Sequence, residues 1–338
     1  MSQTPHLPAD PLNRFRDLYD VLNAERGWFG DPSSLRFAAM TAVTCQGSPT
    51  EVASAIRSMA EEIKRLSGWF GELNSSLRFI VSAILVLNRD SASDFLAEVE
   101  RGRELFRQAS LRRGGIYETM AILILRLQND RGPITADAVV RFKAIYEEMK
   151  RHHWWLTGPD DFPACAILVG QEASPGEIGT AIERIYQALN ETGFSTGDPL
   201  QTAANLLYLS RLDPDVAAER YFELANGFRQ SGVAIWQSDY DELAILTFLN
   251  HPPYRVVERV LEHRKAMEEL KPKPDRSLTF NLAASIAFLE LVQLDENHES
   301  ITDAKALMDM QSIINAQQAA AAAAASSAAA TAAASSSS

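Results

Sequence analysis

Two adjacent histidines and two adjacent aspartates lie within one ten-residue stretch and form the strongest candidate for chemistry in the sequence. His152 and His153 end a charged segment, and Asp160 and Asp161 precede an apolar one. Imidazole and carboxylate groups together could bind a divalent metal or act as general acid and base. Helix capping by Asp, and the favourable position of His at a helix end, explain the same residues structurally. Both interpretations stay open, and the sequence identifies no cofactor.

A second acidic group occurs in the segment SDYDELAIL, where Asp239, Asp241 and Glu242 precede apolar residues. Carboxylates in the first turn of a helix are favoured by the helix dipole, which gives this group a structural explanation. Alternatively, Asp241 could join the histidines and aspartates above in a catalytic site.

Arginines recur at equivalent positions in two copies of the pentapeptide SSLRF, as Arg36 and Arg78. Each copy begins an apolar segment, and such segments could line a concave surface whose polar rim binds a ligand or peptide. The alternative is that these polar residues pair with charges on neighbouring helices. The members of the predicted rim are Arg36, Arg78, Glu118, Asp161, Gln201 and Asp241.

The elements that position these residues repeat along the chain. The tripeptide Ala-Ile-Leu, or a close variant, recurs with a period near 40 residues. Each copy lies in an apolar segment that is nearly free of charge, which is typical of a helix buried on all sides. The small Ala would let a neighbouring helix approach closely. We predict seven such apolar helices, starting near Ser34, Ser76, Gly115, Asp160, Asp198, Asp239 and Ser277.

Longer, charged segments with apolar residues at helical spacing separate the apolar helices, and they predict amphipathic outer helices. The sequences SPTE (48–51) and SPGE (174–177) are capping boxes with Pro at the first helical position. Ser91, Thr135 and Asp213 indicate further helix starts. Aromatic residues in the turns that follow are expected to fill gaps between helix pairs; they are Trp28, Phe29, Trp69, Phe70, Trp154, Trp155, Phe194 and Trp236.

The fold class that follows is all-α, an α/α superhelix of about seven tandem antiparallel helix pairs. A curved solenoid and a closed α/α ring both fit the pattern. We predict one helical repeat domain over residues 1–317 and an Ala/Ser-rich low-complexity tail over 318–338. No secretory signal is visible, and the apolar stretches outside the tail are too short to span a bilayer, so we expect a cytoplasmic protein without a membrane span.

Composition and motifs narrow the function. The net charge is −12 and no cluster of positive charge occurs, which argues against a nucleic-acid partner. The phosphate-binding motif GxxxxGK, the dinucleotide motif GxGxxG, the hydrolase motif GxSxG and the metalloprotease motif HExxH are all missing. The two cysteines, Cys45 and Cys165, lie in apolar segments and are too few for a disulfide framework.

The segment RHHWWLTGPDDFPACAIL (151–168) is the most distinctive part of the sequence. Together with FKAIYEEMK before it and the Ala/Ser tail, it resembles a family of uncharacterised bacterial helical proteins, catalogued as domain of unknown function four thousand and three. The resemblance implies an all-helical protein and no activity. The matching positions are His153, Leu156, Thr157, Asp160 and Asp161, with Phe162 where the family usually has Tyr.

Two functions remain. The repeat architecture and the missing catalytic motifs favour a scaffold that binds a protein or peptide. The alternative is a metal-assisted or acid/base enzyme, with its acidic and histidine residues at the starts of the apolar helices gathered in a central cavity. The sequence gives neither the ligand nor the oligomeric state.

Overall fold

The computed structural model describes residues 7–24, 31–67, 73, 77–153 and 156–293. These residues contain fourteen α-helices, several short 3-10 turns and no strand. The predicted tail, 318–338, and the aromatic pairs 28–29, 69–70 and 154–155 lie outside the described residues. The helices are α1 (Pro11–Ala24), α2 (Pro32–Thr41), α3 (Pro49–Ser67), α4 (Arg78–Asn88), α5 (Ala92–Gln108), α6 (Ile116–Gln128), α7 (Ala136–His152), α8 (Phe162–Val169), α9 (Pro175–Glu191), α10 (Asp198–Tyr208), α11 (Pro214–Gln230), α12 (Tyr240–Leu246), α13 (Pro253–Glu268) and α14 (Arg276–Gln293).

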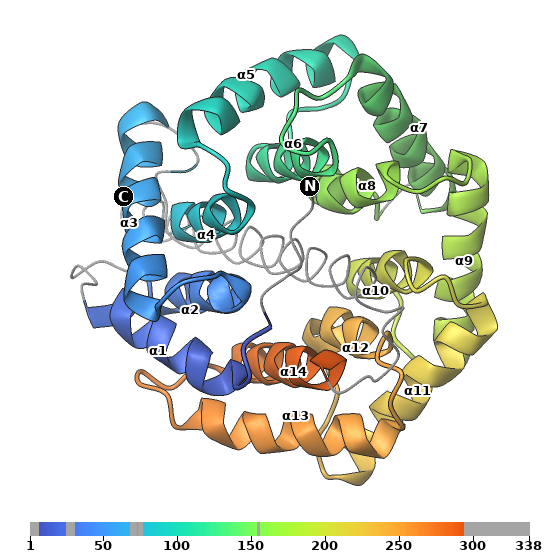
Figure 1. Ribbon diagram of the computed structural model, residues 1–338. Helices are drawn as coiled ribbons and strands as arrows, with labels where there is room; N and C mark the ends of the chain where they lie inside the picture. Colours follow the sequence, from blue (N-terminus) through green and yellow to red (C-terminus); the bar gives the residue numbers. More distant parts are fainter. Residues whose placement is uncertain (1–6, 25–30, 68–72, 74–76, 154–155, 294–338) are drawn as a thin grey trace, which may run out of the picture. The chain divides into compact units, whose positions relative to one another are not determined.

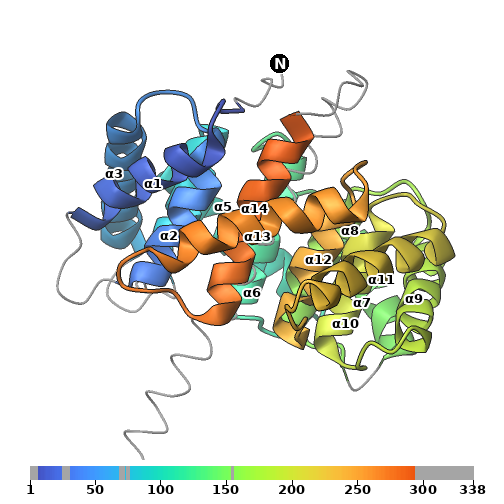
Figure 2. The same cartoon turned by 90° about the horizontal axis from the view of Figure 1, so that it is seen from below.

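The chain forms two compact units, with the boundary inside α7. Unit 1 contains residues 13–139, with α2 to α6 and all of α1 except its first two residues. Unit 2 contains residues 9–12 and the described residues from 140 onward, with α8 to α14. Within unit 2, the apolar helices α8, α10, α12 and α14 follow one another side by side, flanked by α7, α9, α11 and α13 (Figure 1). Helix α13 lies against α14 in both views (Figures 1 and 2). In unit 1, α2 and α4 lie together and α3 packs on α4.

The all-α prediction is confirmed, and the apolar helices begin within two residues of their predicted starts. Their burial differs from that of the amphipathic helices as the sequence pattern indicates. Thirteen of the eighteen residues of α14 are buried, against six of the seventeen in α9. The two helix types therefore alternate along the described chain, while the number of repeats stays a prediction. No helix among the described residues is long and apolar enough to cross a membrane.

The predicted helix starts are confirmed by their hydrogen bonds. Ser48 and Glu51 exchange bonds in one capping box, and Ser174 and Glu177 do so in the other. The side chain of Ser91 accepts a hydrogen bond from the backbone N–H of Asp94, three residues on. Each cap satisfies backbone donors that the helix itself leaves free.

The recurrent alanines lie at the most enclosed positions of the apolar helices. Each of them is at most 3% exposed, so a small side chain permits close helix contact in six of the seven apolar helices. The set comprises Ala83, Ala121, Ala166, Ala204, Ala244 and Ala284.

Arginines of the amphipathic helices hold the loops that follow the next apolar helix. Arg14 of α1 donates to the carbonyls of Cys45 and Gly47, which follow α2. Arg141 of α7 donates to three carbonyls between residues 169 and 173, directly after α8. Arg220 of α11 donates to the carbonyl of His251 at 3.1 Å. A planar guanidinium can satisfy several such carbonyls at once.

The turn aromatics that the structure describes behave in two ways. Phe194 is buried, and its ring packs edge-on against Tyr221 at 4.8 Å and Tyr240 at 5.4 Å between centroids, so it fills a gap between helix pairs as predicted. The same prediction is wrong for Trp236, which is 60% exposed. Its ring lies at the surface under the guanidinium of Arg276, 5.1 Å from the ring centroid, and a cation–π contact replaces burial.

Gly102 of α5 marks a close approach to α6, because a Cβ built there would lie 2.9 Å from Ile122 side-chain carbons. Gly102→Ala should lower the free energy of unfolding by about 1 kcal/mol, since overpacking costs about 1–3 kcal/mol and helix propensity returns about 1 kcal/mol. Gly176→Ala, which meets nothing within 4 Å, should instead stabilise by about 0.4–1 kcal/mol. Calorimetric melting of both variants checks this, and shifts of the same sign would contradict it.

Candidate polar binding site

Polar side chains occur at repeat-equivalent positions at or near the starts of successive apolar helices of unit 2. Starting from Asp161, they follow at intervals of 40, 41 and 39 residues, and all are buried. Because the apolar helices lie side by side, this repeat spacing places the four at the same level of neighbouring helices. We call them the polar row: Asp161, Gln201, Glu242 and Asn281.

Asp161 lies in a short 3-10 turn, Pro159–Asp161, that leads into α8. Its side chain makes no cap bond to α8 but reaches back, and Oδ2 accepts a hydrogen bond from the backbone N–H of Gly158 at 3.0 Å. Burial raises the pKa of Asp161 to about 7; the Gly158 bond lowers it, and the nearby carboxylates of Asp160 and Asp198 raise it further. Asp161 thus titrates near neutral pH, the range in which a carboxyl group can serve as acid or base.

Helix α10 contributes two buried amides to the site. Gln201 is 2% exposed, and its Nε2 donates to Oδ1 of Asp161 over a long 3.4 Å. Among the described residues, its Oε1 has no hydrogen-bond partner. Asn205, one helical turn further on and 3% exposed, likewise has no partner in the described part of the chain for either Oδ1 or Nδ2. Buried amides are normally hydrogen-bonded, so these atoms need an explanation.

The three acidic residues at the start of α12 each contact a different partner. Asp239 is fully buried, accepts a hydrogen bond from the backbone N–H of Trp236, and forms an ion pair of 2.6 Å with Arg276. Glu242 accepts a hydrogen bond from Nδ2 of Asn281 on α14. Asp241 accepts a bond of 3.2 Å from the neighbouring backbone N–H. Glu242, one residue beyond the predicted Asp241, is therefore the carboxylate that links α12 to α14.

The two histidines form contacts with a different helix from those that Asp161 uses. His153 Nε2 lies 2.7 Å from Oε2 of Glu183 on α9, and His152 Nδ1 lies 3.9 Å from the same oxygen. The ring of His153 also packs on Tyr186, with centroids 4.4 Å apart. Within the described part of the chain, no group of three or more His, Cys, Asp or Glu side chains is arranged to hold a metal ion.

The predicted rim residues of unit 1 are engaged locally. Arg36 is 2% exposed, and its guanidinium lies 5.1 Å from the ring centroid of Tyr19 on α1. Arg78 lies 5.2 Å from the ring of its neighbour Phe79. Glu118 is buried and accepts a hydrogen bond from the backbone N–H of Gly114. These contacts stabilise the starts and flanks of their own helices.

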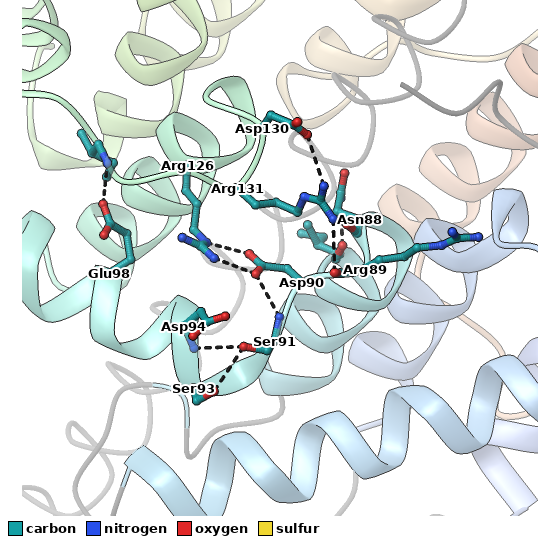
Figure 3. Close-up of polar contacts among 12 residues, drawn as sticks. Asn88, Arg89, Asp90, Ser91, Ser93, Asp94, Glu98, Arg126, Asp130 and Arg131 are labelled. Carbon is teal, nitrogen blue, oxygen red and sulfur yellow. Dashed lines mark hydrogen bonds and ion pairs between the residues drawn. The ribbon is translucent and has the colours of Figure 1, made fainter. Parts of the chain in front are cut away.

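A buried ion pair in unit 1 was not indicated by the sequence (Figure 3). Arg126 of α6 donates from Nε and one Nη to the two carboxylate oxygens of Asp90, each at 2.7 Å. The side chains are 7% and 3% exposed. Arg131 donates to the carbonyls of Asn88 and Arg89 at the end of α4, beside this pair (Figure 3). The cluster joins α4 to α6, and all its charged groups have partners, so it has a structural role.

Comparison with known proteins places the chain in a family. The family model described as protein of unknown function (DUF4003) matches residues 18–319, which confirms the resemblance noted from the segment 151–168. The Bacillus subtilis (strain 168) protein "Uncharacterized protein YeaA" is 25% identical over 264 residues, which cover 77% of this chain and 78% of that protein. No solved structure matches.

Proposed function

Because the chain belongs to the DUF4003 family, whose description assigns no function, we propose one from its structure: a scaffold that binds a peptide or protein partner. A polar group of that partner, or a small molecule of the same chemistry, docks at the polar row of unit 2. The observation that carries the proposal is the pair of buried amides on α10, Gln201 and Asn205, with hydrogen-bonding atoms that have no partner.

The energetics support binding over a purely structural role. An unsatisfied buried polar group costs about 1–3 kcal/mol, and Asn205 alone leaves two such atoms unpaired. A folded protein keeps such a cost where function uses the group. A ligand that pairs with these amides recovers the cost on binding.

Replacement of Asn205 tests the proposal because stability and binding should change in opposite directions. Asn205→Leu should raise the free energy of unfolding of the ligand-free protein by about 1–3 kcal/mol, since it removes the unpaired atoms at nearly constant shape. The same variant should lose the thermal shift that a ligand, found by screening peptides and metabolites, gives with the wild type.

A matched control is Asn88→Leu, since Nδ2 of Asn88 donates to the carbonyl of Ile84 at 2.8 Å. This change removes a satisfied hydrogen bond in unit 1, so it should not stabilise the protein and should leave the ligand shift intact. A screen without any hit would count against the proposal, and so would a shift that survives Asn205→Leu.

An acid/base enzyme is the second candidate, and the titration of Asp161 near pH 7 favours it. In that case a bound compound would be converted, and NMR of the incubated mixture would detect its product. Asp161→Asn would abolish conversion and retain binding, because the amide keeps the acceptor for Gly158. If the bound compound is unchanged after long incubation, the result contradicts the enzyme and supports the binding scaffold.

A further inference from the structure

The carboxylates around the start of α8 and α10 define the charge that a ligand of the polar row must carry. Asp160 and Asp198 are exposed, and the carboxyl of Asp161 is buried. The charged groups that act on Asp161 are these two carboxylates, and both oppose its ionisation. An anionic ligand would be repelled here, whereas a cation would relieve the repulsion.

The amide of Gln201 points into this acidic group. Its Nε2 contacts Oδ1 of Asp161, and its Oε1 is an acceptor that lacks a donor. Carboxylate oxygens are acceptors as well when ionised. Gln201 and the ionised carboxylates therefore offer acceptors, and a ligand that matches them brings donors.

We propose that this site binds a primary ammonium group, presented by a lysine side chain of a peptide partner or by a free amine, at Asp161, Asp198 and Gln201. The inference rests on the proposed binding function. An ammonium group carries three donors and no acceptor, which suits two carboxylates and one amide oxygen. A lysine stem is slender and apolar, so it can reach groups that are almost fully buried. A guanidinium is planar and needs a wider approach.

The titration of Asp161 is consistent with this assignment. Burial and like charge hold its pKa near 7 in the free protein. A bound ammonium group within contact distance favours the ionised carboxylate and lowers that pKa. In the described part of the free protein, no positive charge acts on the Asp161 carboxylate, and a bound ammonium group would supply one.

Isothermal titration calorimetry of the full chain tests the proposal with probes of defined charge. The amine probes are 1,4-diaminobutane and the tripeptide Gly-Lys-Gly with an acetylated N-terminus and an amidated C-terminus. The same blocked tripeptide with an acetylated lysine side chain is the matched peptide without an ammonium group. Succinate, glucose and Mn²⁺ represent anions, neutral polar compounds and divalent metals. We expect heat from the amines at millimolar concentration and none from the acetylated peptide. Tighter binding of Gly-Lys-Gly than of the diamine would identify a peptide as the source, and the reverse a free amine.

Two variants assign the binding to the site, and a third serves as control. Asp198→Asn and Gln201→Leu should each weaken amine binding roughly tenfold or more, because each removes a contact to a charged group. Asp137→Asn, at an exposed first-turn position of α7, should leave the affinity unchanged. Circular dichroism verifies that all three variants are folded.

The possible outcomes separate this inference from the function on which it rests. Binding of succinate, glucose or Mn²⁺ that depends on Gln201 would overturn the ammonium assignment and leave the binding function standing. If Asp137→Asn weakens amine binding as much as the site variants do, the amines are attracted by the acidic surface in general. That result would contradict a specific ammonium site at Asp161, Asp198 and Gln201. No heat from either amine overturns the inference, whereas the Asn205→Leu experiment decides the binding function separately.

Discussion

Asp161→Asn should raise the melting temperature of this protein at pH 8 and leave it almost unchanged at pH 4. The pKa of Asp161 is about 7 in the folded protein, against an ordinary value of 3.8. Between these values the folded state binds a proton that the unfolded state has released, so stability falls as the pH rises. The difference corresponds to at most about 4 kcal/mol above pH 7, and the asparagine variant does not incur it.

Calorimetric melting of wild type and variant from pH 4 to pH 8 measures this effect as the difference between the two curves. Asn retains the acceptor for the Gly158 N–H, and its amide can donate to Oε1 of Gln201 once the Gln201 amide group turns over. The control Asp137→Asn replaces an exposed carboxylate and should give a difference that does not grow in this way with pH. Parallel curves for Asp161→Asn and wild type would refute the shifted titration.

The second large effect is expected at the buried ion pair of unit 1. Arg126→Met should lower the free energy of unfolding by about 3–5 kcal/mol, because it leaves the Asp90 carboxylate buried without its cation. Chemical denaturation monitored by circular dichroism measures the loss. The backbone N–H of Ser91 also donates a hydrogen bond to the Asp90 carboxylate, at 2.9 Å, but this bond cannot replace two charge-assisted bonds.

Two further variants show whether burial is the cause. The double variant Asp90→Asn with Arg126→Met removes both charges and should recover part of the loss. Arg184→Met breaks an exposed pair with Asp215 and should lower the free energy of unfolding far less than Arg126→Met does. Equal losses for Arg126→Met and Arg184→Met would show that the enclosed pair contributes no more than a surface one.

Features with local causes could be predicted from the sequence. The capping boxes at 48–51 and 174–177 depend on residues three apart, and the alanine position recurs in six of the seven apolar helices. Both are confirmed because neighbouring residues or repeat copies alone determine them. The exposure of Trp236 depends on Arg276, 40 positions later, and the turn pattern alone could not reveal it.

The candidate site was predicted less completely, for geometric reasons. The sequence predicts a rim that includes Asp161, Gln201 and Asp241, whereas at the start of α12 Glu242 accepts the bond from Asn281. One residue along a helix turns a side chain by about 100°, so a shift of one position changes the face that it occupies. The pair Asp90–Arg126 joins residues 36 apart that, in sequence, resemble ordinary surface charges.

The arginines that bind loop carbonyls bear on how this fold opens and how it changes in evolution. Arg14 and Arg141 each tie the beginning of one helix pair to the chain just after its second helix, so the bond encloses a single pair. When one helix pair opens, the hydrogen bonds of its own arginine break, and the arginine–carbonyl bonds of the other pairs stay intact. Hydrogen exchange should therefore proceed pair by pair, each as a cooperative segment. The arginine and the carbonyls that it binds lie within one pair, so insertion or deletion of a whole pair adds or removes both together. The helix pair is therefore the unit by which such a chain can lengthen or shorten.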